Sequence, residues 1–226
     1  MAGIYLELRF WDGAAWSTHA TAITGNDGRY QFLDAPGLGT DQVYCVLYRN
    51  GRAGNANNPN YLWLWLCRYI TSYSAGATLP GGDFDIANIF LVSPNPGASV
   101  TLPATFRWTR RSVTADSYRL VLYYADLDEI AFTNLLGYVD GVTITSIPPT
   151  WPSGASYRWW IEAHYGDGQD NYGQSYYNRV ITISYSSEAG EDDSALSPTI
   201  WDLEAPGFAA SHGWPADEIS GLWTSP

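Results

Sequence analysis

The stretch GGDFDIANIFLVSPNPG, residues 81–97, decides how the rest of the chain is divided. Its middle, residues 84–92, is a short apolar run that predicts a β-strand. Two glycines precede this run and the cluster PNPG follows it, and both compositions break regular structure. We therefore expect one β domain, residues 1–92, to end here and a second, residues 93–185, to begin.

Composition favours a folded protein with real cores. The 226 residues are 46% hydrophobic and 15% aromatic, which suffices for two small domains. The formal net charge of -12 argues against nucleic acid or an anionic membrane as a partner, because a polyanion needs a basic face. No apolar stretch approaches the roughly 18 residues of a membrane-spanning helix, so no membrane span is expected.

The first domain begins with a clear alternating pattern. In IYLELRF, residues 4–10, the apolar side chains recur at every second position, which predicts a half-buried strand. The residues on that apolar face are Ile4, Leu6, Leu8 and Phe10. Further strands are predicted at residues 16–24, 29–32, 43–50 and 61–70, separated by Gly, Asn and Asp turn signals. The pattern indicates an antiparallel β-sandwich.

The run TGNDGRYQF, residues 24–32, and the later VYCV, residues 43–46, resemble the T-x-x-D-G-x-Y-x-F pattern of prealbumin-like modules. These are the carboxypeptidase-regulatory-like and CnaB-type domains of bacterial surface proteins, and the resemblance covers residues 4–90. Such modules usually open with a further V-x-G-x-V strand, which does not precede residue 4, so we expect the first sandwich to lack its opening strand. Many also carry a lysine isopeptide bond, which is excluded because all eleven cationic residues are arginines.

The second domain has the spacing of another antiparallel sandwich. Strands are predicted at residues 106–109, 118–125, 142–147, 156–165 and 176–185. In YRWWIEAHY, residues 157–165, Trp159 and Ile161 lie on one face and Glu162 on the other. The S-P-x-x-G segment with the following F-x-W and Y-x-W pairs resembles fibronectin-type-III or Ig-like modules of prokaryotic cell-surface proteins. That resemblance implies a fold and no activity.

Two cysteines lie in apolar segments on either side of a Gly/Asn loop. Cys45 and Cys67 are either two buried free thiols or a disulfide between neighbouring strands. We favour the disulfide, because the composition is typical of extracellular proteins. The bridge would stabilise the fold by about 3 kcal/mol in the chain-entropy model.

The C-terminal region changes character twice. Residues 186–198 are acidic and almost free of large side chains, which predicts a solvated linker. Residues 199–226 are apolar and aromatic again, and a tail of this composition needs a surface to cover it. Its large apolar residues are Ile200, Trp201, Leu203, Phe208, Trp214, Ile219, Leu222 and Trp223.

Catalytic and metal-binding patterns are sparse. The three histidines lie in separate regions, and there is no nucleophile elbow or phosphate-binding loop, so we expect no enzyme and no cofactor. Asp167 and Asp170 are candidate Ca²⁺ ligands, although acidic loops of this kind are more often only solvated. The many aromatic residues suggest either core packing or stacking on surface glycans. The candidates for stacking are Trp11, Trp16, Trp151 and Trp160.

The sequence as a whole predicts an all-β protein of two tandem antiparallel sandwiches with an aromatic tail, located outside the cell or on its surface. We expect a structural role in which copies of the chain assemble head-to-tail. The tail would add to the open edge of the next subunit's first sandwich, along Ile4, Leu6, Leu8 and Phe10. Three alternatives remain: the tail packs on its own chain, the missing strand lies upstream in a longer chain, or the protein is an adhesin or carbohydrate-binding module.

Overall fold

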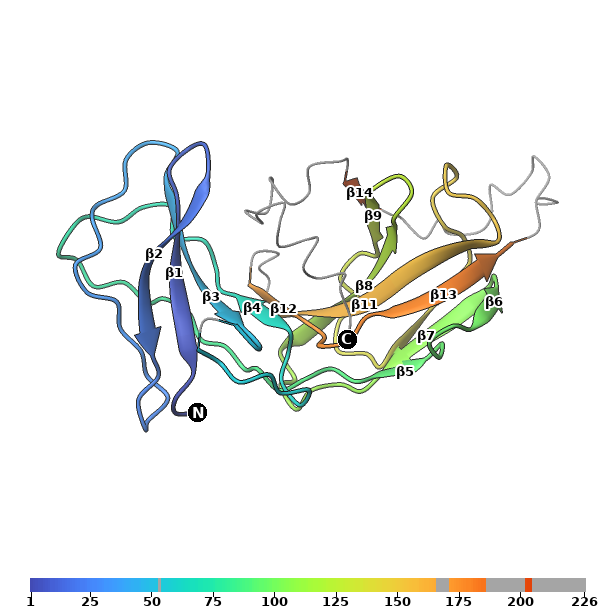
Figure 1. The fold of residues 1–226 in the computed structure, drawn as a ribbon, viewed down its shortest axis with the longest axis horizontal. Helices are drawn as coiled ribbons and strands as arrows, with labels where there is room; N and C mark the ends of the chain where they lie inside the picture. The colour runs from blue at the N-terminus through green and yellow to red at the C-terminus, as the bar shows by residue number, and fades with distance from the viewer. Residues whose placement is uncertain (53, 166–170, 186–201, 205–226) are drawn as a thin grey trace. The chain divides into compact units, whose positions relative to one another are not determined.

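The computed structural model describes residues 1–52, 54–165, 171–185 and 202–204, and these residues form strands and loops without a helix (Figure 1). None of them therefore supplies a helix long and apolar enough to cross a membrane. The chain divides into two compact units between Ala87 and Asn88. The all-β class predicted from the sequence is confirmed, and the division falls slightly before residue 92.

The first unit is built on one sheet with the strand order β12-β4-β3-β1-β2, in which β4, β3, β1 and β2 pair antiparallel. The strand predicted at residues 4–10 is confirmed as β1, which pairs with β2 on one side and with β3 on the other. It is not half-buried as predicted, because Glu7 and Arg9 on its polar face are buried as well. The strands of this sheet are β1 (Tyr5–Trp11), β2 (Trp16–Ile23), β3 (Val43–Arg49), β4 (Leu64–Leu66) and β12 (Tyr172–Gln174).

The register of this sheet fixes which side chains share a face. Glu7 lies opposite Leu47, whereas Leu6 lies opposite Tyr48, so these two pairs point to opposite sides. The face of Leu47 carries a buried cluster of Cys45, Leu47, Leu64, Leu66 and Tyr172. The opposite face buries Leu6, Leu8, Val46, Tyr48 and Trp65. Both faces of the sheet are therefore buried along its central strands, and the face of Leu47 also holds the ion pair of Arg9 and Glu7, at 3.3 Å.

Residues 171–173 belong to the first unit and are packed tightly within it. Trp65 Nε1 donates a hydrogen bond to Asn171 Oδ1 at 3.0 Å. A Cβ atom added at Gly173 would lie 2.4 Å from the Trp65 ring and 2.5 Å from Leu62 Cδ1. Only glycine fits this position, because the neighbouring side chains are fully buried and cannot move away.

The segment that divides the chain forms less strand than predicted. Only Leu91–Ser93 is a strand, β5, and residues 84–90 lie outside strands. Asp85 Oδ1 accepts a hydrogen bond from Ala87 N at 2.9 Å, and Asn88 Oδ1 accepts one from Ile89 N at 2.8 Å. These local side-chain bonds occupy amides that a sheet ladder would use, so the strand does not extend through them.

The second unit contains two sheets. In the larger one the order is β14-β9-β8-β11-β13-β6, antiparallel except for the parallel β13–β6 pair. Its strands are β6 (Ser99–Thr101), β8 (Asp116–Tyr124), β9 (Glu129–Phe132), β11 (Ala155–Tyr165), β13 (Arg179–Ser184) and β14 (Asp202–Glu204). The smaller sheet has the order β10 (Gly141–Ile144), β7 (Ala104–Trp108), β5.

Aromatic side chains fill the core between these two sheets. Phe106 on β7 meets Trp159 on β11 edge-to-face, with ring centroids 5.1 Å apart. Trp108 packs on Tyr118 at 5.8 Å. These four side chains are buried, as the alternating pattern predicts for residues that face a sheet partner. The second unit is therefore β-sandwich-like.

Candidate functional site

The C-terminal tail contributes one strand to the described structure, at the edge of the larger sheet of the second unit. β14 pairs antiparallel with β9, and Asp202, Leu203 and Glu204 lie opposite Phe132, Ala131 and Ile130. On its other side β9 pairs with β8. Without β14, the backbone of β9 would face solvent as a sheet edge whose own side chains are buried.

The predicted tail residues are only partly within the described chain. Leu203 lies in β14, so its backbone position is defined. The other residues of the set, Ile200, Trp201, Phe208, Trp214, Ile219, Leu222 and Trp223, lie outside the described residues, as does the linker of residues 186–198. The tail strand β14 therefore pairs, within the described residues, with β9 of the same chain.

The predicted acceptor edge in the first unit is wrong. β1 has strands on both sides, so its backbone is already paired from Leu6 to Phe10. Just before β1, Ile4 O accepts a hydrogen bond from Thr24 N at 2.9 Å, and Ile4 N donates to Thr24 Oγ1 at 2.9 Å. The chain lacks a free edge at β1 because the return strand β2 covers the side that the sequence prediction had left open.

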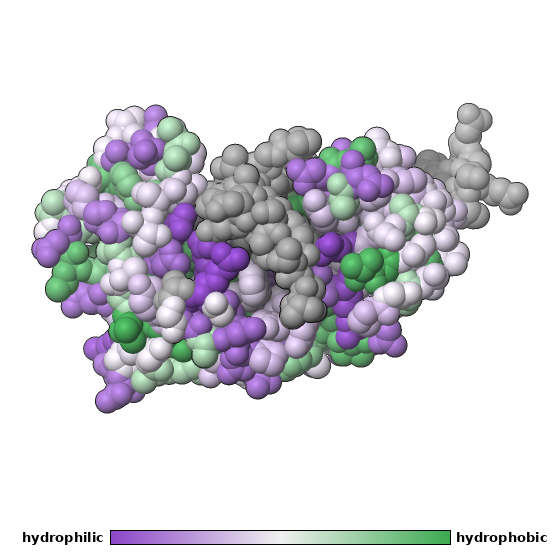
Figure 2. Space-filling model, in the orientation of Figure 1, coloured by the Kyte–Doolittle hydropathy of each residue, from purple (hydrophilic) through white to green (hydrophobic). Residues whose placement is uncertain are grey.

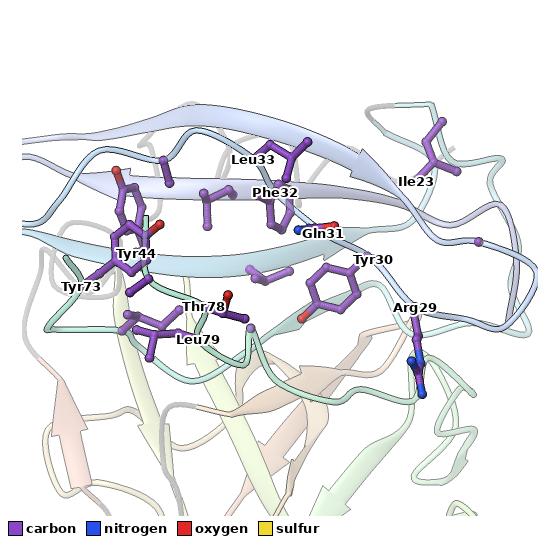
Figure 3. Close-up of a pocket in the computed structure, with 17 residues that line it drawn as sticks. Ile23, Arg29, Tyr30, Gln31, Phe32, Leu33, Tyr44, Tyr73, Thr78 and Leu79 are labelled. Atoms are coloured by element: carbon purple, nitrogen blue, oxygen red, sulfur yellow. The ribbon is translucent and has the colours of Figure 1, made fainter. Parts of the chain in front are cut away.

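A groove lies over one face of the first unit's sheet, and it has a volume of about 730 Å³. Its floor includes Leu8, Tyr44 and Val46, and its rims are residues 29–35 and 77–81 (Figure 3). Figure 3 shows Tyr44 and Tyr73 at one end and Arg29 at the other. The residues that line the groove are mostly apolar or aromatic, which is typical of a binding site for an apolar group.

Two tyrosine hydroxyls tie the rims of this groove to the unit. Tyr30 Oη donates to Gly82 O at 2.7 Å, and Tyr44 Oη donates to Pro36 O at 3.1 Å. Burial raises the pKa of both phenols, and for Tyr30 the nearby Cys67 and Asp83 raise it further. Both tyrosines therefore stay neutral at physiological pH and can act as donors.

Apolar exposure on the molecule is otherwise scattered. On the face drawn in Figure 2, green hydrophobic residues lie among purple hydrophilic ones and form no continuous patch. Single exposed apolar residues are normal on soluble proteins. The groove differs because three of its residues, Leu33, Ile23 and Leu79, are 67%, 63% and 45% exposed around one hollow.

Cys45 and Cys67 are buried free thiols, so the predicted disulfide is wrong. β3 and β4 pair with Leu47 opposite Leu66. Continued by one residue, this register sets Val46 opposite Cys67, in agreement with the 2.8 Å bond from Cys67 N to Val46 O. Successive residues of a strand point to opposite faces, so the two thiols lie on opposite sides of the sheet. Burial raises the pKa of both, that of Cys67 to about 12.

The predicted glycan-stacking residues fall into two groups. Trp11 and Trp16 lie opposite each other at the end of the β1–β2 hairpin, half-buried, with centroids 5.7 Å apart. Trp151 is fully buried against Tyr157 and donates from Nε1 to Glu129 at 2.7 Å. Trp160 is buried as well. The last two offer no ring face to a sugar, so the prediction is wrong for them.

The candidate calcium ligands Asp167 and Asp170 lie outside the described residues. Within the part of the chain that the structure describes, no group of three or more His, Cys, Asp or Glu side chains is arranged to hold a metal ion. One buried polar cluster there joins His164 Nε2 to Glu162 at 3.3 Å, with Trp160 Nε1 at 3.4 Å from the same carboxylate.

No known family model matches this chain, and no curated protein is significantly similar to it. The argument for function therefore depends on two features of the described structure. These are the β14–β9 edge of the second unit and the apolar groove of the first.

Proposed function

We propose that this protein is an extracellular structural subunit that assembles with copies of itself through its C-terminal strand. The observation that carries the proposal is the pairing of β14 with the edge of β9. A strand supplied by the end of the chain can be supplied equally by another copy, because the hydrogen-bond ladder is the same in both cases.

The chain between the second unit and β14 is long enough for this exchange. β13 ends at Ser184 and β14 begins at Asp202. At about 3.3 Å per residue, a fully extended connection reaches roughly 60 Å, which exceeds the diameter of a domain of this size. Its acidic, small-residue composition does not require it to pack against the unit.

Exchange has two geometric outcomes. Two copies that swap β14 reciprocally form a closed dimer, whereas copies that each pass β14 onward form an open, head-to-tail chain. We propose the open chain, because a surface filament or layer needs a contact that repeats. The short β14–β9 ladder, with three residue pairs, is weak enough to exchange without unfolding the unit.

The resemblances stated above support the same proposal. We propose that the first unit is a prealbumin-like module and the second a fibronectin-III or Ig-like module. In the second unit Tyr157 Oη donates to Pro152 O a few residues upstream, a bond similar to the tyrosine corner of Ig-like sandwiches. Modules of both kinds are typical of surface-displayed prokaryotic proteins, and neither implies catalysis.

Truncation tests the proposal. Removal of residues 199–226 should abolish assembly in sedimentation velocity and electron microscopy while far-UV circular dichroism stays unchanged. Leu203→Pro is a finer probe, because proline in β14 disrupts the ladder, and Leu196→Pro in the linker is its matched control. Full-length protein and the Leu196 variant should form the same fibres. Fibres from the truncated protein, or a full-length monomer at millimolar concentration, would refute the proposal.

The half-exposed pair of Trp11 and Trp16 favours a second candidate, a surface adhesin that binds glycans. Indole rings at a hairpin end can stack on the apolar face of a sugar. Affinity electrophoresis in gels that contain soluble polysaccharides distinguishes the two candidates. Retardation of a monomer that Trp11→Ala abolishes would favour the adhesin, and unchanged mobility would leave self-assembly as the function.

A further inference from the structure

The rims of the groove in the first unit lack the strands that their sequence predicts. Residues 29–32 match the strand of the prealbumin-like pattern, yet they lie outside any strand. Among the described residues, no backbone hydrogen bond is made by residues 30–35. On the opposite rim, residues 78–81 make none either. Backbone donors and acceptors of both rims are therefore available to an added segment.

The side chains around the groove point to an apolar guest. Leu33, Ile23 and Leu79 are exposed beside the hollow, and Tyr44 and Tyr73 close one end (Figure 3). A volume of about 730 Å³ lies within the range of roughly 300–1,000 Å³ that binding pockets occupy. An apolar strand would cover these side chains and pair with the open backbone at once, which a small molecule would not do.

We propose that this groove accepts residues 218–224, EISGLWT, from the C-terminal tail of a second copy. The inference rests on the proposed self-assembly and names a second acceptor for the same tail. In an extended conformation Ile219 and Trp223 point to one side, with Gly221 between them, so that the two large side chains enter the groove and the chain approaches the rim closely.

Charge gives this guest a direction. Arg29 lies at one end of the groove, and its side chain is 89% exposed. Asp217 and Glu218 directly precede Ile219. If the acidic end of the segment lies next to Arg29, Trp223 lies towards Tyr44 and Tyr73, where its ring meets other aromatic rings. The exposed charges orient the strand and contribute little affinity, because solvent and salt screen them.

The joint is asymmetric. The guest segment and the groove are different parts of the chain. A contact between two different surfaces is heterologous, so each copy both gives and accepts a strand. The groove thus supplies the acceptor that the sequence prediction had placed on the edge of β1.

Cysteine cross-linking tests this assignment in the full chain. Leu33→Cys places an exposed thiol on the groove rim, and Ile219→Cys places one on the side of the guest segment that would face the groove. The native Cys45 and Cys67 are 2% and 1% exposed and do not compete. When the two single variants are mixed under mild oxidation, a disulfide forms only if the Cβ atoms come within about 4.5 Å. Leu127→Cys, 43% exposed in the second unit, replaces the groove variant in the control mixture.

We expect a disulfide-linked heterodimer from the Leu33 and Ile219 variants, at several times the yield of the Leu127 control. Yield equal to the control overturns the inference. A double variant that cross-links only within one chain at every concentration overturns it too, because the tail then fills its own groove. Sedimentation of the wild-type protein separates the two proposals. Assembly without the specific cross-link refutes only the groove assignment, whereas a monomer at millimolar concentration refutes self-assembly itself.

Discussion

Replacement of Asp116 by asparagine should destabilise the second unit severely. Asp116 and Arg111 form a bidentate ion pair, with Nε to Oδ2 and Nη2 to Oδ1 both at 2.8 Å. Both side chains are 0% exposed. Asparagine keeps the shape of the side chain but removes its charge, so the guanidinium of Arg111 is left buried beside a neutral amide.

The expected loss is about 3–5 kcal/mol, the usual effect of removing one partner from a buried pair. Part of the loss arises because two tyrosine hydroxyls hold the backbone of Arg111 in the same buried cluster. Arg111 N donates to Tyr118 Oη at 2.8 Å, and Tyr138 Oη donates to Arg111 O. With a urea m-value of about 1–3 kcal/mol/M, the transition midpoint of the second unit should fall by roughly 1–5 M, and by about 2 M for mid-range values.

Urea unfolding followed by tryptophan fluorescence measures this change, because Trp108 and Trp159 lie in the same core. Hydrogen exchange of peptides from β8 assigns the loss to the second unit. The matched control is Asp27→Asn, whose partner Arg29 lies 3.7 Å away with both side chains largely exposed. That variant should match wild type. A midpoint for Asp116→Asn within error of the control would refute the reasoning.

Two further predictions follow from buried titratable groups. Cys45 and Cys67 should not react with an aromatic disulfide reagent at pH 8 in the native protein, because burial raises the pKa of each thiol. Both should react after the protein is unfolded in denaturant. A change in the intact mass of the protein on reduction would contradict this. Burial alone would raise the pKa of Glu162, yet the hydrogen bond and charge of His164, with the charge of Arg119, hold it below its usual value. Its stabilising contribution is therefore present at neutral pH and is lost as pH falls below about 4.5. Glu162→Gln should make acid unfolding less steep, and an unchanged pH profile would contradict this.

The local patterns that predict strands are those in which one residue type repeats at every second position. IYLELRF gives β1, and YRWWIEAHY gives β11 with Trp159 and Ile161 in the core. The same alternation failed to show that the second face of β11 is also buried, at Glu162 and His164. An alternating pattern predicts which residues share a face of the sheet, but it does not predict which faces other parts of the chain bury.

The errors arise where pairing between distant segments decides the outcome. Adjacent strands for Cys45 and Cys67 were predictable, but a register offset by one residue puts the thiols on opposite faces. Ile86 and Ile89 are buried, although Asp85 and nearby polar side chains hold the segment out of the predicted strand. β9 escaped detection because Glu129–Phe132 is only four residues long and carries no alternation.

The groove was not predictable from any single segment. Its floor comes from β1 and β3, and its rims come from two loops about fifty residues apart in the chain. The one sequence signal was the match of residues 29–32 to a strand pattern that lacked its partner. A strand motif that stays outside a sheet therefore marks a place where backbone pairing is incomplete.

In the closed state β14 pairs with β9 of its own chain, and in the joined state it pairs with β9 of a neighbour. The equilibrium between these two states depends on protein concentration rather than on new contacts. β14 makes the same ladder with β9 whether it comes from its own chain or from a neighbour, so the enthalpy of pairing cancels between the two states. A tethered strand has an effective concentration on the order of millimolar, which favours the closed chain in dilute solution. Under the proposed function, subunits crowded on a surface would reach comparable concentrations, which would favour the joined state. The proposed subunit would thus remain closed while dilute and polymerise where it accumulates.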